Sequence, residues 1–320
     1  MPSSKIQFLL MESLRSQVES LAEEISHRPN LSVNYTLVED VHQPVNLDVS
    51  QVSVLVTVHS IGQGIADCLK RARQAGVRSL TIQDGIIEYS HCWRRPRSRN
   101  RYRPVLSDRI AVMGRFSRDI LASWGNDKDA IHITGLPRFD QYPALRSAPP
   151  TKSHVLVTCA NTPFQGRDER ESFVDLMNAI GAELNRRQLR WTARLPKSVL
   201  ACLSSDFEGV FSNASMRKGA ETDIAASTCV ISTMSTMVVE AMAVEKPTAI
   251  VNPSNETLYL HTPWTISCRA HISTVLDELL NPPAPKLALQ CMVRDYHLVC
   301  DGKSSQRLAD LITAMAKGDQ

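Results

Sequence analysis

The sequence predicts an α/β protein with two Rossmann-like domains, each a doubly wound parallel sheet. Three observations support this prediction. Segments such as residues 52–58 and 154–158 are almost continuously apolar, as strands buried on both faces of a parallel sheet are. Helical segments alternate with these strands, which is typical of repeated strand–helix–strand units. A proline-rich stretch at residues 143–150 separates the two halves.

The first half alternates strands and helices. We expect an amphipathic helix over residues 12–26, because Leu14, Val18 and Leu21 recur on one face. Gly76 and Gly125 each follow a helical segment and end it. The expected strands are residues 5–11, 31–37, 52–58, 78–82, 108–113 and 130–134, and the other expected helices are residues 65–75 and 115–124.

The second half repeats this alternation. A tail interrupted by prolines ends in an amphipathic helix over residues 307–316. We expect an N-terminal domain over residues 1–146 and a C-terminal domain over residues 152–320, with the last helix packed back on the first domain. The expected strands are residues 154–158, 190–195, 210–212, 229–231 and 248–251, and the other expected helices are residues 169–187 and 237–244.

Composition limits the function. Of the 320 residues, 43% are hydrophobic, which is enough for a substantial core. A net charge of +3 and an aromatic content of 5% argue against nucleic acid as a partner. The 8 cysteines form no C-x-x-C pair, so we expect reduced thiols and a cytoplasmic location. The apolar run at residues 6–11 is too short for a signal peptide or a membrane span.

The most informative stretch is residues 223–251, which we expect to fold as strand, turn, helix and strand. A helix that begins directly after a parallel strand presents free backbone N–H groups, so its start can hold a phosphate or diphosphate. Ser235 and Thr236 can donate to phosphate oxygens, and Glu240, one turn later, can accept from the hydroxyls of a ribose. An ordinary capped helix explains the two hydroxyl residues equally well.

Other polar residues follow strands of the first half. His59 and the turn Gln83-Asp84-Gly85 lie at expected carboxyl ends of strands, where ligands bind in such sheets. For His59 an ordinary turn histidine is the alternative. Six arginines fall between residues 94 and 103. This segment is either a contact for an anionic acceptor or a membrane surface, or a solvated loop.

Four stretches together resemble the GT-B superfamily of nucleotide-sugar enzymes. Within it, the chain looks most like CDP-glycerol glycerophosphotransferases, capsule and surface-polysaccharide transferases, and the UDP-N-acetylglucosamine 2-epimerase group. The resemblance covers residues 52–320 and implies two domains that face each other across a cleft. The four stretches are Gln83-Asp84-Gly85, Asp108 with Gly135-Leu136-Pro137-Arg138-Phe139-Asp140, residues 232–241, and Asp301-Gly302-Lys303-Ser304.

By this resemblance, the second domain holds a nucleotide-diphosphate donor and the first an anionic saccharide or lipid-linked acceptor. A strand-end arginine such as Arg194 can make bidentate contacts with a phosphate, although a surface arginine is an equal alternative. The expected donor-binding residues are Arg194, Asn161, Thr162, Ser232, Ser235, Thr236 and Glu240, and the expected acceptor-binding residues are Arg94, Arg95 and Arg138.

Two departures from the related transferases bear on catalysis. These proteins often show Gln-His-Gly where this chain has Gln83-Asp84-Gly85, so Asp84 would replace histidine as the base. They also often show His-Pro after the basic strand, where this chain has Leu195-Pro196. The other candidate bases are Glu88, His91 and His59.

We therefore expect a transferase without a metal or cofactor, acting in cell-surface polysaccharide biosynthesis. It would move a sugar or polyol phosphate from the donor to the acceptor. Its expected location is the cytoplasm, with the inner face of the membrane as an alternative place of contact. Two other hypotheses stay open: a UDP-sugar 2-epimerase, and a nucleotide-binding protein on a GT-B scaffold that has lost catalysis.

Overall fold

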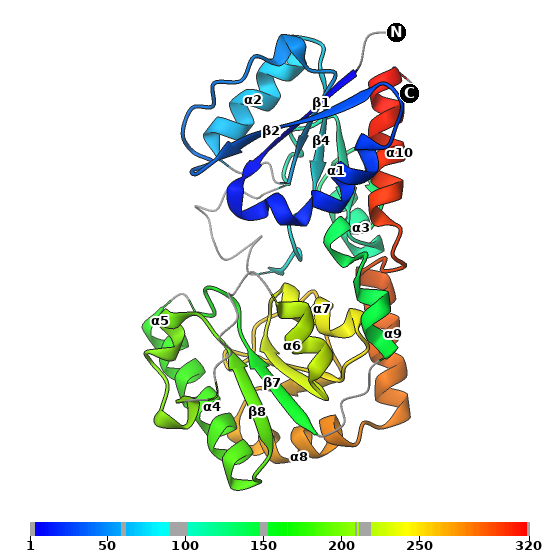
Figure 1. Cartoon of the computed structure of the whole chain (residues 1–320). Helices are drawn as coiled ribbons and strands as arrows, with labels where there is room; N and C mark the ends of the chain where they lie inside the picture. The colour runs from blue at the N-terminus through cyan, green and yellow to red at the C-terminus, as the bar shows by residue number, and fades with distance from the viewer. Residues whose placement is uncertain are drawn as a thin grey trace. The chain divides into compact units, whose positions relative to one another are not determined.

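The structure is a computed structural model that describes residues 4–58, 62–89, 102–147, 153–164, 166–208, 210 and 219–318. Its contacts divide the chain into two compact units (Figure 1). Unit 1 consists of Met1–Ile87, His91–Gln141 and Tyr296–Gln320, and unit 2 of Glu88–Ser90 and Tyr142–Asp295. Each unit is an α/β fold around a parallel sheet, which confirms the predicted fold class.

Unit 1 is built on a six-stranded sheet with the order β2-β1-β3-β4-β5-β6, in which every pair of neighbours is parallel. All four residues of β3 are buried, as expected for an apolar strand covered on both faces. The strands are β1 (Ser4–Met11), β2 (Leu31–Val38), β3 (Val54–Thr57), β4 (Arg78–Ile82), β5 (Arg109–Val112) and β6 (Ile131–Ile133).

Helices cover both faces of this sheet. Leu9 and Leu55 pack with α2, and Ile110 and Val112 pack with α3. On the other face α10 packs on β3 and β4 and lies beside α1 (Figure 1). The helices are α1 (Glu19–Ser26), α2 (Gln63–Gln74), α3 (Arg115–Ser123) and α10 (Ser304–Lys317), with 3-10 turns η1 (Glu12–Gln17), η2 (Val49–Gln51), η4 (Lys128–Ala130) and η5 (Pro137–Phe139).

The C-terminal segment is attached to unit 1 by close backbone contacts. The N–H of Val299 donates to the carbonyl oxygen of Met113 (2.9 Å). A Cβ on Gly114 would lie 2.3 Å from the carbonyl oxygen of His297, so only glycine allows this approach. The Asp140 carboxylate accepts the N–H groups of Ser304 and Ser305, both at 2.8 Å, and thereby caps α10.

Unit 2 is built on a five-stranded parallel sheet with the order β11-β10-β9-β7-β8. The strands are β7 (His154–Thr158), β8 (Arg190–Arg194), β9 (Cys229–Thr233), β10 (Thr248–Val251) and β11 (Trp264–Ile266). The helices are α4 (Arg167–Arg186), α5 (Lys197–Leu200), α6 (Ala220–Ala226), α7 (Thr236–Ala243), α8 (Arg269–Leu280) and α9 (Ala284–His297), with η6 (Tyr142–Ser147) and η7 (Ser205–Phe207).

Strand alternation divides the core of unit 2 between two faces. Val155, Val157 and Ile231 point toward α4 and α8 and form one large apolar cluster with them. The alternate residues point toward the other face, where α6 packs on β7 and α7 packs on β9 and β10. This second face carries the strand-end residues Thr158 and Arg194.

Most predicted elements are confirmed within about two residues, and a few predictions are wrong. Residues 12–26 are not one helix, because Val18 leaves helical geometry (φ −123°) and separates η1 from α1. Val210 is not in a strand, although its carbonyl oxygen accepts the N–H of Ala193 (2.7 Å), and residues 211 and 212 lie outside the described residues. Short elements such as α6 and β11 were not anticipated.

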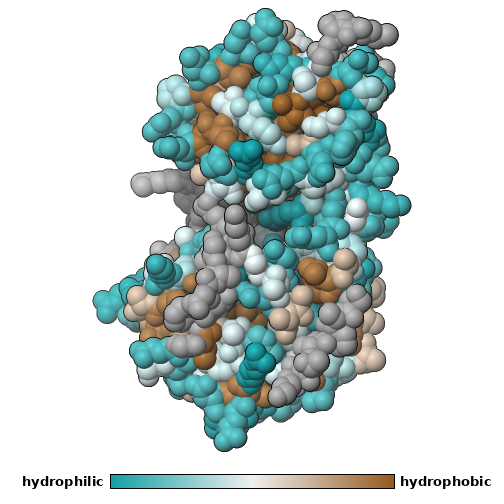
Figure 2. All heavy atoms as spheres, viewed as in Figure 1, coloured by the Kyte–Doolittle hydropathy of each residue, from teal (hydrophilic) through white to brown (hydrophobic). Residues whose placement is uncertain are grey.

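Figure 2 shows a mainly hydrophilic face, with hydrophobic residues in patches on both units. In unit 1, β2 is an edge strand of the sheet. Nearly every residue of this edge strand is partly exposed. Within the described ranges, no helix combines the length and the apolar character needed to cross a membrane.

Candidate functional site

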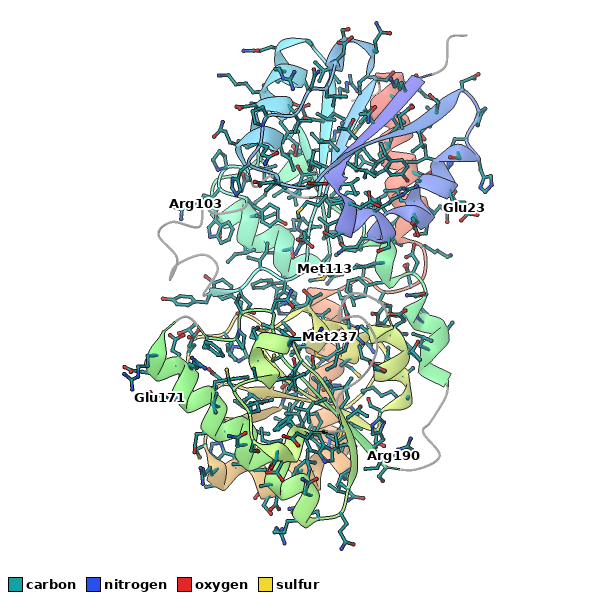
Figure 3. The ribbon with its side chains drawn as sticks, turned by 60° about the vertical axis from the view of Figure 1, so that its left-hand side comes forward. Glu23, Arg103, Met113, Glu171, Arg190 and Met237 are labelled. Carbon is teal, nitrogen blue, oxygen red and sulfur yellow. The ribbon has the colours of Figure 1, made fainter. Side chains whose placement is uncertain are left out.

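The carboxyl edge of the sheet in unit 2 gathers polar residues from three neighbouring strands. The register pairs Thr158, at the end of β7, with Arg194 on β8 and with Ser232 on β9. Arg190, labelled in Figure 3, begins β8, so Arg194 lies at the opposite end of that strand. Because the three strands are parallel, their ends meet at the edge where open α/β sheets bind ligands.

The turn between β9 and α7 presents two hydroxyl groups. Ser235, the N-cap of α7, is extended and makes no side-chain capping hydrogen bond to described residues. Met237, labelled in Figure 3, follows Thr236 in the first turn of α7. Ser235 and Thr236 are partly exposed and can reach a ligand. Ser232 is fully buried, and its hydroxyl donates to the carbonyl of Thr233 (2.7 Å), so it shapes the turn instead.

Glu240 lies on α7 one turn after Thr236, as the sequence suggested. Its side chain is almost enclosed, with a residue exposure of 9%. Asn161 and Thr162 are exposed in the loop after β7. The N–H of Ala160 donates to the hydroxyl of Thr233 (2.8 Å), which fixes the start of this loop beside the end of β9. The ligand roles of these residues stay predictions.

Arg194 lies inside unit 2 and forms an ion pair with Asp223 on α6. Its Nη1 is 2.7 Å from Asp223 Oδ2, and the two side chains are 1% and 24% exposed. A charge this deep needs a partner, because an unpaired buried ion is strongly destabilising. The pair therefore ties α6 to the end of β8. The phosphate contact expected of Arg194 stays a prediction.

Glu88 belongs to unit 2 and is 1% exposed. Its Oε1 accepts the N–H of Leu260 (2.9 Å), and its Oε2 accepts the N–H groups of Tyr259 (3.2 Å) and Tyr89 (3.3 Å). Successive N–H groups that converge in this way form an anion-binding nest. The carboxylate thus holds the loop between β10 and β11, which leaves the same carboxyl edge of the sheet. Its predicted role as a base stays a prediction.

Burial and hydrogen bonding act on Glu88 in opposite directions. Removal from water raises the pKa of this carboxyl to about 7, and the three backbone N–H groups lower it by a smaller amount. The same loop is closed on itself by Asn252, whose side chain donates to the carbonyl of Glu256 (3.0 Å) and accepts its N–H (3.0 Å). The loop between β10 and β11 is therefore held by its own Asn252 and by Glu88, which comes from a distant part of the chain.

In unit 1 the turn Gln83-Asp84-Gly85 is held by its neighbours. Gln83 is 1% exposed, donates to the carbonyl of Gly85 (2.7 Å) and accepts the N–H of Met113 (2.9 Å). The Tyr102 hydroxyl accepts the N–H of Asp84 (3.0 Å). Gly85 has a φ of +74°, which favours glycine. The partly exposed Asp84 side chain therefore stands on a fixed backbone at the carboxyl end of β4.

Arg138 lies in η5, which follows β6 in unit 1. Its guanidinium is 5.0 Å from the centre of the Phe139 ring. The remaining predicted site residues in the first half, His59, His91, Arg94 and Arg95, lie outside the described residues. Within the described ranges no cluster of three or more His, Cys, Asp or Glu side chains could hold a metal ion.

Sequence reasoning missed the partners that organise the site. Asp223 and Asp140 were noticed only as the first residue of residues 223–251 and the last residue of the Gly135–Asp140 motif, and Tyr102 and the backbone of Tyr259 and Leu260 were not considered. Their contacts join residues far apart in the chain, so no local pattern indicates them. The spacing of Asp140 after Pro137 in the motif was the one available signal.

Comparisons with solved structures agree with this architecture. The UDP-GlcNAc 2-epimerase from Neisseria meningitidis bound to UDP-GlcNAc matches with a TM-score of 0.69 and 12% identity, over 97% of this chain and 99% of that chain. The wall teichoic acid polymerase TagF matches with a TM-score of 0.69 and 14% identity, over 98% and 89%. MnaA of S. aureus with UDP matches with a TM-score of 0.68 and 14% identity, over 98% and 97%.

No family model matches the sequence, and no curated protein sequence matches it either. At these identities the likeness shows the fold. The chain has the GT-B fold of UDP-GlcNAc 2-epimerases and TagF, which confirms the resemblance seen in its motifs.

Proposed function

We propose that this chain is a GT-B transferase that moves a sugar or polyol phosphate from a nucleotide-diphosphate donor to an anionic acceptor in cell-surface polysaccharide biosynthesis. The observation that carries the proposal is the turn between β9 and α7. Two partly exposed hydroxyls, Ser235 and Thr236, stand at a helix start on the carboxyl edge of a parallel sheet. UDP-GlcNAc and UDP bound to two of the similar proteins make a nucleotide the first ligand to test.

In this proposal unit 2 holds the donor. Backbone N–H groups at the start of α7, with Ser235 and Thr236, bind the phosphates, and Glu240 accepts from the ribose hydroxyls. Asn161 and Thr162 extend the same surface from the end of β7. Arg194 and Asp223 act beneath it, because their buried ion pair fixes α6 beside the strand ends.

The proposed reaction is a displacement at a sugar carbon or at a phosphorus atom. The acceptor hydroxyl oxygen forms the new bond, and its proton passes to the carboxylate of Asp84. The bond to the nucleotide oxygen breaks, and its electron pair stays on that oxygen. The leaving group is a nucleoside diphosphate for a sugar donor and a nucleoside monophosphate for a CDP-polyol. The helix start of α7 stabilises the charge that develops there.

Two alternatives make different predictions. A UDP-sugar 2-epimerase would interconvert UDP-sugars with no acceptor present, and the epimerase neighbours favour testing this first. A protein that has lost catalysis would bind a nucleotide without turnover. The replacement of histidine by Asp84 and of His-Pro by Leu195-Pro196 favours this second alternative.

Calorimetric titration with UDP, CDP and GDP tests the donor site. We expect one nucleotide to bind and Glu240→Ala to weaken it by about tenfold or more, since a charge-assisted hydrogen bond is lost. Glu208→Ala, at an exposed position of the same unit, is the matched control and should leave the affinity unchanged. Failure of all three nucleotides to bind would sink the proposal and both nucleotide-based alternatives.

Product analysis with the bound nucleotide's sugar or polyol conjugate tests the chemistry. Asp84→Asn should lower turnover by about 10² to 10⁴-fold, the usual contribution of a general base. Nucleotide affinity should stay the same, because Asp84 belongs to unit 1 and the donor to unit 2. Normal turnover by Asp84→Asn would remove Asp84 as the base and leave the donor site standing.

A further inference from the structure

Arg138 carries two buried nitrogen atoms that have no hydrogen-bond partner among the described residues. Its Nε and Nη2 are both enclosed, and neither contacts an acceptor within the described part of the chain. These two atoms form one edge of the guanidinium, the fork that binds two oxygens of one anion side by side. Arg186 uses the same edge: its Nε and Nη2 donate to the two carboxylate oxygens of Glu183, both at 2.7 Å.

An enclosed fork without an acceptor is unfavourable. Buried donors are almost always satisfied, and each exception calls for an explanation such as an ion or a ligand. The enclosed arginine of unit 2 has a carboxylate partner, because Nη1 of Arg194 is paired with Asp223. For Arg138 no carboxylate lies within ion-pair distance among the described residues. The described part of the fold thus encloses the Arg138 cation without placing a carboxylate beside it.

The position of Arg138 favours a ligand over an accident of packing. Its turn, η5, leaves the carboxyl end of β6 and packs against η1 and α1. The segment η1 directly follows β1, and β1 lies between β2 and β3 in the sheet. The strand order reverses its direction there, and open α/β sheets bind ligands at such a switch point.

The backbone beneath Arg138 is rigid. Leu136 and Phe139 are 2% and 0% exposed, and the Asp140 carboxylate is fully engaged by two N–H groups of α10. Asp140 is therefore already committed and does not neutralise the guanidinium two residues before it. A fork held on a fixed backbone loses little conformational freedom when it binds an oxyanion.

We propose that Arg138 binds an oxyanion of the acceptor through Nε and Nη2, a phosphoryl or carboxylate group that offers two oxygens to one fork. The assignment of this anion to the acceptor rests on the proposed function, whereas the anion site itself does not depend on that function. Neither nitrogen touches solvent in this conformation, so the covering groups move as the anion enters. The bound anion is then enclosed and shielded from water.

Binding of simple anions tests the site. The unfolding midpoint is measured against concentration of sodium phosphate, and separately of sodium acetate, with sodium chloride at equal ionic strength as the reference. The variants are Arg138→Met, which removes the charge, and Arg138→Lys, which keeps the charge but loses the fork. Arg118→Met is the matched control, because Arg118 is an exposed residue of unit 1 paired with Asp119.

We expect phosphate or acetate to stabilise the wild type and Arg118→Met beyond chloride, and the more effective anion identifies the group. Both Arg138 variants should bind it about tenfold to a hundredfold more weakly, as expected for loss of a bidentate charged pair. An undiminished response of Arg138→Met, or a wild type that responds only as it does to chloride, would overturn the proposal.

Nucleotide titration separates this site from the donor site. Arg138→Met should bind the nucleotide within about twofold of wild type, since its lost contact lies in unit 1. A parallel loss of nucleotide and phosphate affinity would overturn the assignment to the acceptor. A wild type that binds phosphate at Arg138 but binds no nucleotide would refute the proposed function and keep the anion site.

Discussion

Replacing Glu88 with glutamine should change how the stability of unit 2 depends on pH. The carboxyl is 1% exposed, and burial raises its pKa from 4.5 to about 7. The folded protein therefore holds this proton more tightly than the unfolded chain does. Between these two pKa values the unfolded state binds fewer protons, so the free energy of unfolding falls as pH rises.

The magnitude follows from the size of the shift. A rise from 4.5 to about 7 is about 2.5 units, and each unit corresponds to about 1.4 kcal/mol, so the full effect is about 3 kcal/mol. This contribution is complete below pH 4.5 and is lost by about pH 8. In Glu88→Gln it is absent, because the amide does not ionise.

The measurement is the difference in free energy of unfolding between wild type and Glu88→Gln at several pH values. We expect this difference, wild type minus variant, to fall by about 3 kcal/mol from pH 4.5 to 8. Hydrogen exchange at the amides of Tyr259 and Leu260 adds a local readout, since both donate to Glu88. Their protection in the wild type, corrected for intrinsic exchange, should weaken over the same range.

Glu208→Gln serves as the control, because Glu208 is exposed in the same unit and should give a flat difference. A difference for Glu88→Gln that stays flat would show that the carboxyl titrates as it does in water. A difference that rises with pH would show that the three N–H groups outweigh burial and lower the pKa. Either result would refute a Glu88 pKa raised by burial.

Three further predictions concern stability, each measured by denaturant unfolding. Arg194→Ala should cost about 3 to 5 kcal/mol because it breaks an ion pair whose arginine is buried, and the double variant with Asp223→Ala should recover part of this loss; strictly additive losses would contradict the ion pair. Gly64→Ala should lower the free energy of unfolding by more than about 1 kcal/mol, because the added Cβ would lie 1.9 Å from the backbone carbonyl oxygen of Gln43. Gly166→Ala is the control and should not, because nothing lies within 4 Å of a Cβ at that position. Asp140→Ala should cost about 1 to 2 kcal/mol through loss of the α10 cap, and an unchanged midpoint would argue against that cap.

The sequence predicted the long, periodic parts of the fold. Residues 78–82, 154–158 and 248–251 match β4, β7 and β10 at both ends, because buried parallel strands are short, continuous apolar runs. The pattern failed where an element was too short to show a period. β11 has three residues and α6 has seven, and both were assigned to neighbouring segments.

The candidate site was predictable in its position but not in its partners. The polar residues at strand ends indicated that the candidate site lies at the carboxyl edge of each sheet, because parallel strands end together. Arg194 and Asp223 are 29 residues apart, and Glu88 and Leu260 are 172 residues apart. Tertiary packing alone brings such groups together, so exposure and pairing at these positions could not be inferred from local sequence.

The partners found in the fold provide a way to rank charged residues at strand ends. Arg194, Glu88 and Asp140 all looked functional by type or motif, yet each makes contacts within its own unit, with Asp223 or with backbone N–H groups. These contacts position other parts of the fold, whatever further role the groups have. Arg138 differs because both nitrogens of its fork are enclosed and no described residue supplies them with an acceptor. Burying these donors without an acceptor is unfavourable, and a bound anion would offset this cost. Arg138 is therefore the strongest ligand-binding candidate among these charged residues.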